Sequence, residues 1–233
     1  TIDGHCSTEE TIAMAVRAQK MGMRIMINFH YSDSWADPSK QNKPLAWANH
    51  TVAQLKEDVY NHTLEVLTAL KQAGVTPEWV QVGNEIPGGM LWPEGSTNNW
   101  SQLAQFLNSG YDAVKAVNPK IKVVVHVDEG NNNAKFRVFF DNATTQNVKY
   151  DIIGLSYYPY WIKKDYTETI ADLAANLNDM VARYNKDVMV VEVGGEYDKV
   201  QNTYDMLRAT IQAVKNVDRK STRLNSSHLG ISR

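Results

Sequence analysis

The chain contains five short runs of almost uninterrupted apolar residues, and a segment with helical periodicity follows each of them. The runs span 24–31, 79–84, 122–127, 150–156 and 188–193. Their length and β-branched content are typical of strands that are buried on both faces. Because such strands occur in parallel sheets with helical crossovers, the alternation predicts an α/β fold.

Helices are predicted around and between these strands, at 8–21, 51–72, 100–117, 135–142, 167–184 and 200–215. The first should begin at a capping box, in which Ser7 and Glu10 satisfy each other's backbone amides. Gly22 and Gly74 follow two of the helices and are suited to end them. No linker or repeat interrupts the pattern, so we expect a single catalytic domain over residues 1–217.

A parallel sheet of this kind can stay open or close into a barrel. Open nucleotide-binding sheets carry a glycine-rich phosphate loop after the first strand, and neither G-x-G-x-x-G nor a Walker lysine motif occurs here. Polar side chains instead follow the strand ends: His30, Glu85, His126, Asp128, Tyr157 and Glu192. Barrel enzymes keep their chemistry at that rim, so the pattern favours a barrel.

Composition narrows the range of functions. The 233 residues carry a formal net charge of −2 without a basic stripe, which argues against nucleic acid as a partner. No apolar run approaches the roughly 18 residues that a membrane span needs. Cys6 is the one cysteine, so neither an internal disulfide nor a cysteine metal site is expected.

The last sixteen residues, 218–233, lack any hydrophobic period. Residues 218–228 read as the translation of a sequencing-library adapter. We therefore expect 218–233 to be a non-native tail and exclude it from reasoning about the fold. A native basic tail is the alternative.

Two glutamates at predicted strand ends, Glu85 and Glu192, could form the carboxylate pair of a retaining glycosidase. In such a pair one carboxylic acid protonates the leaving oxygen and the other attacks the anomeric carbon. Glu192 lies in an apolar strand, where an unpaired charge costs several kcal/mol. The alternatives are a buried salt bridge for Glu192 and a carboxylate near a helix start for Glu85.

Other polar and aromatic residues have more than one interpretation. His30 and His126 lie on different strands without metal-binding spacing, so substrate contacts are favoured over a metal, and buried structural histidines are the alternative. Trp35, Trp92 and Trp161 fall in predicted loops, where a sugar-stacking role is favoured. Tyr157 and its neighbour Tyr158 could form a stacking wall or be structural. A serine triad is not favoured, because no G-x-S-x-G elbow occurs.

Several longer segments together resemble glycoside hydrolase family 53, the arabinogalactan endo-β-1,4-galactanases. The most specific is Phe29-His-Tyr-Ser-Asp-Ser-Trp-Ala-Asp-Pro38, followed by Gln41 to Trp47. The others are Val80-Gln-Val-Gly-Asn-Glu-Ile86, Gly89-Met-Leu-Trp-Pro93, Leu155-Ser-Tyr-Tyr-Pro-Tyr-Trp161 and Val190-Val-Glu-Val193. The resemblance covers essentially all of residues 3–217.

The resemblance implies roles for the rim residues. Glu85 would be the acid/base at the end of barrel strand four, Glu192 the nucleophile at the end of strand seven, and Asn84 the partner of the substrate 2-hydroxyl. The residues expected to line the galactan groove are His30, Trp35, Asp37, Trp92, His126, Asp128, Tyr157 and Trp161. The chain departs from the family pattern at Ile162-Lys163, where His-Gly is usual, and at Val193-Gly194, where a small polar residue is usual after the glutamate.

On this numbering the first predicted strand is strand three, so the expected fold is a partial (β/α)₈ barrel with roughly strands 3–7. The expected protein is a monomer without a cofactor or a metal, secreted or at the cell surface or periplasm, that acts on β-1,4-galactan. Two alternatives remain: another retaining endo-glycanase of the same barrel clan, acting on mannan or xylan, and a non-catalytic carbohydrate-binding barrel.

Overall fold

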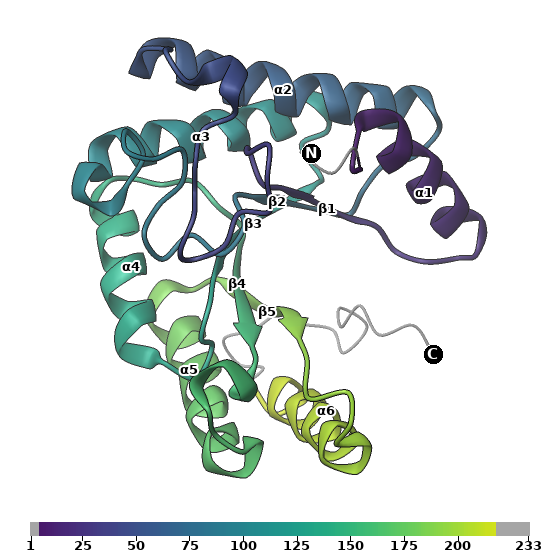
Figure 1. Ribbon diagram of the computed structural model, residues 1–233, viewed down its shortest axis with the longest axis vertical. Helices are drawn as coiled ribbons and strands as arrows, with labels where there is room; N and C mark the ends of the chain where they lie inside the picture. The colour runs from purple at the N-terminus through teal and green to yellow at the C-terminus, as the bar shows by residue number, and fades with distance from the viewer. Residues whose placement is uncertain (1–4, 218–233) are drawn as a thin grey trace. The chain divides into compact units, whose positions relative to one another are not determined.

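The computed structural model describes residues 5–217 (Figure 1). The described strands are β1 (Met26–Phe29), β2 (Trp79–Val82), β3 (Lys122–Val127), β4 (Ile152–Tyr157) and β5 (Asp187–Val193). The α-helices are α1 (Thr8–Lys20), α2 (Val52–Gln72), α3 (Trp100–Val117), α4 (Asn133–Thr145), α5 (Ile170–Tyr184) and α6 (Val200–Lys215). The predicted non-native tail, 218–233, lies outside the described residues.

The strands form a sheet in the order β1-β2-β3-β4-β5. β1 pairs with β2, β2 with β3, and β4 with β5, each in parallel. Since a helix lies between each strand and the next, the predicted parallel α/β fold is confirmed. The described residues form two compact units, one built from 5–125 together with Asn142–Tyr150 and the other from His126–Asp141 together with 151–217.

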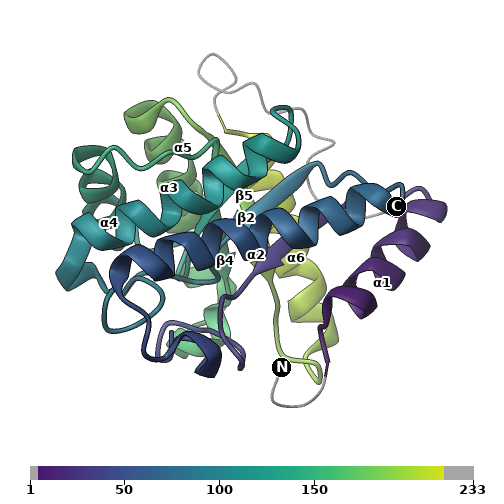
Figure 2. The same ribbon diagram turned by 90° about the horizontal axis from the view of Figure 1, so that it is seen from above.

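In the first unit, α2 and α3 lie side by side (Figures 1 and 2). Leu55, Leu67 and Leu103 on these helices are fully buried, and each buried leucine contributes about 1.5–3 kcal/mol. Gly110 lets α3 approach the sheet closely, because a Cβ there would lie 2.6 Å from Val82 Cγ1. This packing holds β2, and with it the turn that follows β2.

Two helices of this unit, α1 and α2, begin at capping boxes. Ser7 and Glu10 form the expected capping box at α1, with both hydrogen bonds at 3.2 Å. Thr51 and Gln54 form a second capping box at α2. Each box satisfies backbone amides that the first turn leaves without a partner.

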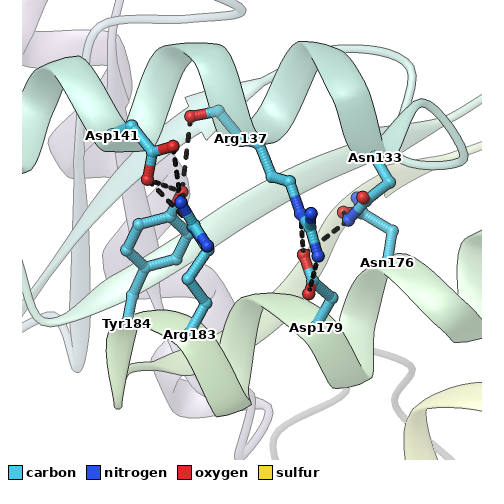
Figure 3. A network of polar contacts seen from close by, with 7 residues as sticks. All are labelled: Asn133, Arg137, Asp141, Asn176, Asp179, Arg183 and Tyr184. Carbon is cyan, nitrogen blue, oxygen red and sulfur yellow. Dashed lines mark hydrogen bonds and ion pairs between the residues drawn. The ribbon is translucent and has the colours of Figure 1, made fainter.

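In the second unit, α4 and α5 are joined by a surface network of ion pairs and hydrogen bonds (Figure 3). Arg137 donates to both oxygens of Asp179 at 2.9 and 2.6 Å. Arg183 donates to both oxygens of Asp141 at 2.9 and 2.8 Å, and the Tyr184 hydroxyl donates to Asp141 at 2.8 Å. Two bidentate pairs in one network fix the two helices more firmly than isolated surface pairs would.

Several element boundaries differ from the predictions: β2 ends two residues earlier than the predicted 79–84, and β4 is shifted from the predicted 150–156. β1 ends at Phe29 because Tyr31 adopts a left-handed backbone with φ +50°. α4 runs over Asn133–Thr145 and is longer than the predicted 135–142. The predicted helix at 167–184 divides into a short 3₁₀ turn, Tyr166–Glu168, and α5. A separate capping box on Asp165 starts that turn.

Candidate active site

The turn that follows β2 places Glu85 under backbone constraint. Gly83 has φ +86°, and a Cβ there would lie 3.0 Å from Ile86 and 3.2 Å from Met90. Glu85 itself has φ +45°, a left-handed conformation that costs a non-glycine residue roughly 1–2 kcal/mol. Backbone strain of this kind persists only where neighbouring groups hold it. The Glu85 side chain is half-buried.

Asn84 is fixed by three hydrogen bonds. Its Oδ1 accepts from Asn28 Nδ2 at 2.7 Å and from Gln81 Nε2 at 3.2 Å. Its Nδ2 donates to the Ala36 carbonyl at 2.9 Å. These bonds use one of the two N–H groups of the amide, and they hold the side chain in one orientation. Asn28 and Gln81 received no functional prediction from the sequence.

Gln41 holds the same turn from the long loop after β1. Its Nε2 donates to the carbonyl oxygens of Asn84 at 2.7 Å, Glu85 at 3.0 Å and Asp37 at 3.2 Å. Its own backbone carbonyl accepts from the Trp92 amide at 2.7 Å, and the residue is 1% exposed. The sequence placed Gln41 in a motif without showing this role, since a polar residue in a polar loop gives no sign of burial.

His30 stands at the end of β1 with its hydrogen-bonding pattern defined. Its Nδ1 accepts from the Ala36 amide at 3.0 Å, so the neutral ring carries its proton on Nε2. Burial lowers the pKa of His30, which also favours the neutral ring. The same loop carries Trp35, whose side chain is 69% exposed. Two of the residues singled out from the sequence thus lie in this segment: His30 as a hydrogen-bond donor and Trp35 as an exposed aromatic side chain.

Asp37 and Trp92 are held by local contacts. Asp37 Oδ1 accepts from the Ser39 amide at 2.8 Å and hydroxyl at 2.6 Å, and Oδ2 lies 3.3 Å from Lys40 Nζ. Although partial burial raises the pKa of Asp37, these hydrogen bonds and the lysine charge outweigh it and lower the pKa overall. Trp92 is half-buried, and its ring N–H donates to the Gly88 carbonyl at 2.9 Å.

In the second unit, a β-bulge determines which way Glu192 faces. The register of β4 and β5 pairs Leu155 with Val190 but Ser156 with Glu192, so Val191 is the extra residue. Side chains alternate between the two faces of a strand, and one inserted residue reverses the alternation. The bulge therefore turns Glu192 to the face that carries Ser156, where a regular strand would have placed Val191.

Tyr158 is the residue that contacts Glu192. Its hydroxyl donates to Glu192 Oε2 at 3.1 Å. Burial raises the pKa of Glu192, and the hydrogen bond from Tyr158 opposes that rise. Gly194 leaves room for the tyrosine ring, because a Cβ there would lie 2.7 Å from Tyr158 Cε1. The Glu192 carboxyl group is therefore half-buried and oriented by a phenol donor.

His126 and Asp128 follow β3 in the same unit. His126 is fully buried, and its Nε2 lies 2.7 Å from Ser156 Oγ. Asp128 Oδ2 accepts from Lys135 Nζ at 2.9 Å, and Lys135 also pairs with Glu129 at 3.0 Å. Burial raises the pKa of Asp128 despite the lysine. The side chains of His126 and Asp128 are thus both held by polar contacts within the second unit.

Tyr157 lies at the end of β4 and is buried. Its side chain is fully buried, and its hydroxyl lies 2.9 Å from Thr169 Oγ1 at the start of α5. This burial favours the structural alternative for Tyr157, and its substrate contact stays a prediction. The adjacent Tyr158 points the other way, toward Glu192. Trp161 lies in the following 3₁₀ turn (Pro159–Ile162) and is 73% exposed.

Each unit thus assembles its own part of the predicted site. The first brings together His30, Gln41, Asn84 and the Glu85 turn, and the second brings together His126, Ser156, Tyr158 and Glu192. Within residues 5–217, no group of three or more His, Cys, Asp or Glu side chains is arranged to hold a metal ion. No helix in that range is long and apolar enough to cross a membrane.

Sequence comparison identifies relatives of the chain. The sequence model of Glycosyl hydrolase family 53 matches residues 1–226. An uncharacterized protein of Niallia circulans is 42% identical over 82% of this chain and 53% of its own length. The arabinogalactan endo-β-1,4-galactanase of Humicola insolens is 38% identical over 82% of this chain and 58% of its own length. The chain spans about half the length of these curated relatives.

Solved structures are also similar to this chain. A structure of two fungal β-1,4-galactanases is 32% identical with a TM-score of 0.84, and the match covers 93% of this chain and 71% of that one. The family 53 catalytic domain of Ignisphaera aggregans is 33% identical with a TM-score of 0.78, covering 93% of this chain and 64% of that one. These similarities and the strand order confirm the predicted partial (β/α)₈ barrel.

Proposed function

Because the chain belongs to glycosyl hydrolase family 53, we propose that the protein cleaves β-1,4-galactan internally by a retaining double displacement. Glu192 is the nucleophile and Glu85 the acid/base. The observation that carries this proposal is the placement of Glu192: a bulge turns it to the face of Ser156, and the Tyr158 hydroxyl donates to one of its oxygens, a hydrogen bond that favours the ionised form.

The first step forms a glycosyl-enzyme. The ionised Glu192 attacks the anomeric carbon while Glu85 gives its proton to the glycosidic oxygen, so the C–O bond to the leaving sugar breaks as the ester bond forms. In the second step Glu85, now ionised, takes a proton from water, and the water oxygen displaces Glu192. The anomeric configuration is retained, and the mechanism requires the two carboxyl groups to lie about 5–5.5 Å apart.

The backbone around Glu85 supports the acid/base role. A residue that donates a proton and then takes one must keep its position through both steps. The Gln41 amide binds the carbonyl oxygens of Asn84 and Glu85. The Asn84 side chain keeps one N–H for a substrate hydroxyl, a contact that strengthens in the oxocarbenium-like transition state.

The remaining predicted residues supply binding. The neutral His30 ring can donate from Nε2 to a sugar hydroxyl. Trp35 and Trp161 present exposed rings on which pyranose faces can stack. Trp92, Asp37, His126, Asp128 and Tyr157 stay proposals as groove residues. The galactan side chains of pectin are the proposed substrate, and the proposed place of action is outside the cell, by a monomer.

Activity on different polymers tests the substrate. Reducing-sugar release should be highest on β-1,4-galactan; higher release from mannan or xylan would replace the substrate assignment. Absence of release from all three, with binding retained, would favour a non-catalytic carbohydrate-binding barrel.

Azide rescue tests the two glutamates separately. On an aryl β-galactobioside, Glu192→Ala with azide should give the α-galactosyl azide, because azide enters from the nucleophile's side. Glu85→Ala should give the β-azide, because the glycosyl-enzyme still forms and azide replaces water. Glu57→Ala, a change at an exposed glutamate on α2, is the control and should keep full activity. Interchanged azide products would reverse the two roles.

A further inference from the structure

A cavity in the second unit is lined by the chain segments that follow β4 and β5. It has a volume of about 370 Å³, within the roughly 300–1,000 Å³ range of small-molecule sites. Its walls come from the segment after β4, which begins at Pro159 directly after Tyr158, and from the segment after β5, which begins at Gly195, three residues beyond Glu192. The two lining segments thus begin within three residues of Tyr158 and of Glu192 along the chain.

The cavity is lined by more cationic side chains than are paired with its carboxylates. Lys199 is paired with Glu196 at 2.5 Å. Asp165 is occupied as well, because Oδ1 accepts from the Thr167 amide and Oδ2 accepts from Asn202 at 2.6 Å. Lys163 and Lys164 also line the cavity and are exposed, and within residues 5–217 neither forms an ion pair.

Two further features indicate what these lysines could bind. Tyr160 and Tyr166 line the cavity with them, and the Tyr160 ring is 51% exposed. Lys163 holds a left-handed backbone with φ +56° at the end of the 3₁₀ turn that carries Tyr160 and Trp161. Aromatic faces beside two unpaired cations suit a pyranose ring that bears a negative charge.

We propose that this cavity binds a sugar carboxylate, that is, a uronic acid unit, with Lys163 and Lys164 as its cationic partners and Tyr160 as its stacking face. The inference rests on the proposed function for the ligand being a saccharide. It extends that function, because cleavage of a neutral galactan needs no anion site. The acidic sugar would belong to the same polymer and lie beyond the chain segment that is cut.

Direct binding tests this inference independently of turnover. Digalacturonate, neutral galactobiose and acetate are each titrated into the protein and followed by NMR. Digalacturonate should shift resonances of residues 159–166 and 195–206, and its affinity should fall as salt rises. Acetate should bind far more weakly, because it lacks the ring. Equal binding of galactobiose in this cavity would overturn the charge argument, and equal binding of acetate would overturn the sugar argument.

A paired substitution completes the test. Lys163→Gln with Lys164→Gln should weaken digalacturonate binding about threefold to tenfold, as expected for two exposed ion pairs, and should leave cleavage of pure galactan unchanged. The control is Lys20→Gln with Lys56→Gln, which removes the same charge from exposed positions on α1 and α2. An unchanged affinity in the first variant would refute the proposal. If the wild-type protein binds digalacturonate but does not cleave galactan, only the proposed function is refuted.

Discussion

Replacing Gln41 by leucine should impair catalysis more than it impairs stability. The amide of Gln41 shares two hydrogens among three carbonyl oxygens, those of Asp37, Asn84 and Glu85. A buried hydrogen bond contributes about 0.5–1.5 kcal/mol, so the loss is about 1–3 kcal/mol. Leucine also removes Gln41 Oε1, a buried acceptor without a partner, which returns about 1 kcal/mol. The net destabilisation should be at most about 2 kcal/mol.

The catalytic effect follows from the backbone of Glu85. Its left-handed conformation stores roughly 1–2 kcal/mol, and without Gln41 the turn can relax and move the carboxyl group. A displacement of about 1 Å can reduce the rate on the order of 100-fold. The loss should appear in kcat, with KM changed by less than about threefold, because Gln41 is buried and does not contact substrate.

The assay combines steady-state kinetics on galactan with urea unfolding of the same variant. Gln105→Leu, at an exposed glutamine on α3, is the control and should leave both quantities near wild type. If Gln41→Leu loses stability as expected but keeps kcat within about twofold, the turn is held by other contacts and the positioning role of Gln41 is wrong.

Tyr158→Phe removes the hydrogen bond that opposes the raised pKa of Glu192, so the acid limb of the kcat/KM profile should move to higher pH. An acid limb that does not move would show that Tyr158 does not influence the pKa of the nucleophile. Glu192→Gln should raise the free energy of unfolding at pH 7, where folding disfavours the ionised carboxylate. The gain should shrink as pH falls and vanish by about pH 3, below the ordinary pKa of about 4.3, where the wild-type carboxyl is protonated in both states. Gly194→Ala should displace the Tyr158 ring and lower kcat at least as much as Tyr158→Phe, since its Cβ would lie 2.7 Å from that ring; wild-type kcat would show that the ring can shift freely. Hydrogen bonds from Arg137 lower the pKa of Asp179 to about 2, so Asp179→Asn should destabilise the protein at pH 6, with the difference closing as pH falls from about 4 to 2, and a constant difference would contradict the linkage.

Strands and helices could be predicted from the sequence wherever the local pattern decides the structure. The apolar runs at 122–127 and 188–193 became β3 and β5 within one residue, because strands buried on both faces must be apolar throughout. The capping box on Ser7 was correct for the same local reason. Glu85 and Glu192 stood out because carboxylates at the ends of such strands need a function or a partner.

Features that depend on register or on distant contacts were not predictable. The sequence predicts a regular strand over Val190–Val193, and no residue type in it indicates the bulge that turns Glu192. For the same reason the sequence did not separate Tyr157, whose hydroxyl lies 2.9 Å from Thr169 Oγ1, from Tyr158, whose hydroxyl binds Glu192. Gln41 acts across 43 residues of chain, so its role emerges only when the loop and the β2 turn are folded together.

Covalent trapping tests the central claim most directly. The protein is incubated with a 2-deoxy-2-fluoro-galactobiosyl fluoride, in which the fluorine at C2 slows the second displacement, and is then digested and analysed by mass spectrometry. Glu192 should carry the fluorinated sugar as an ester, and Tyr158→Phe should still be labelled, only more slowly at low pH. A label on any other side chain, or turnover that releases the inverted anomer without an intermediate, would contradict the account.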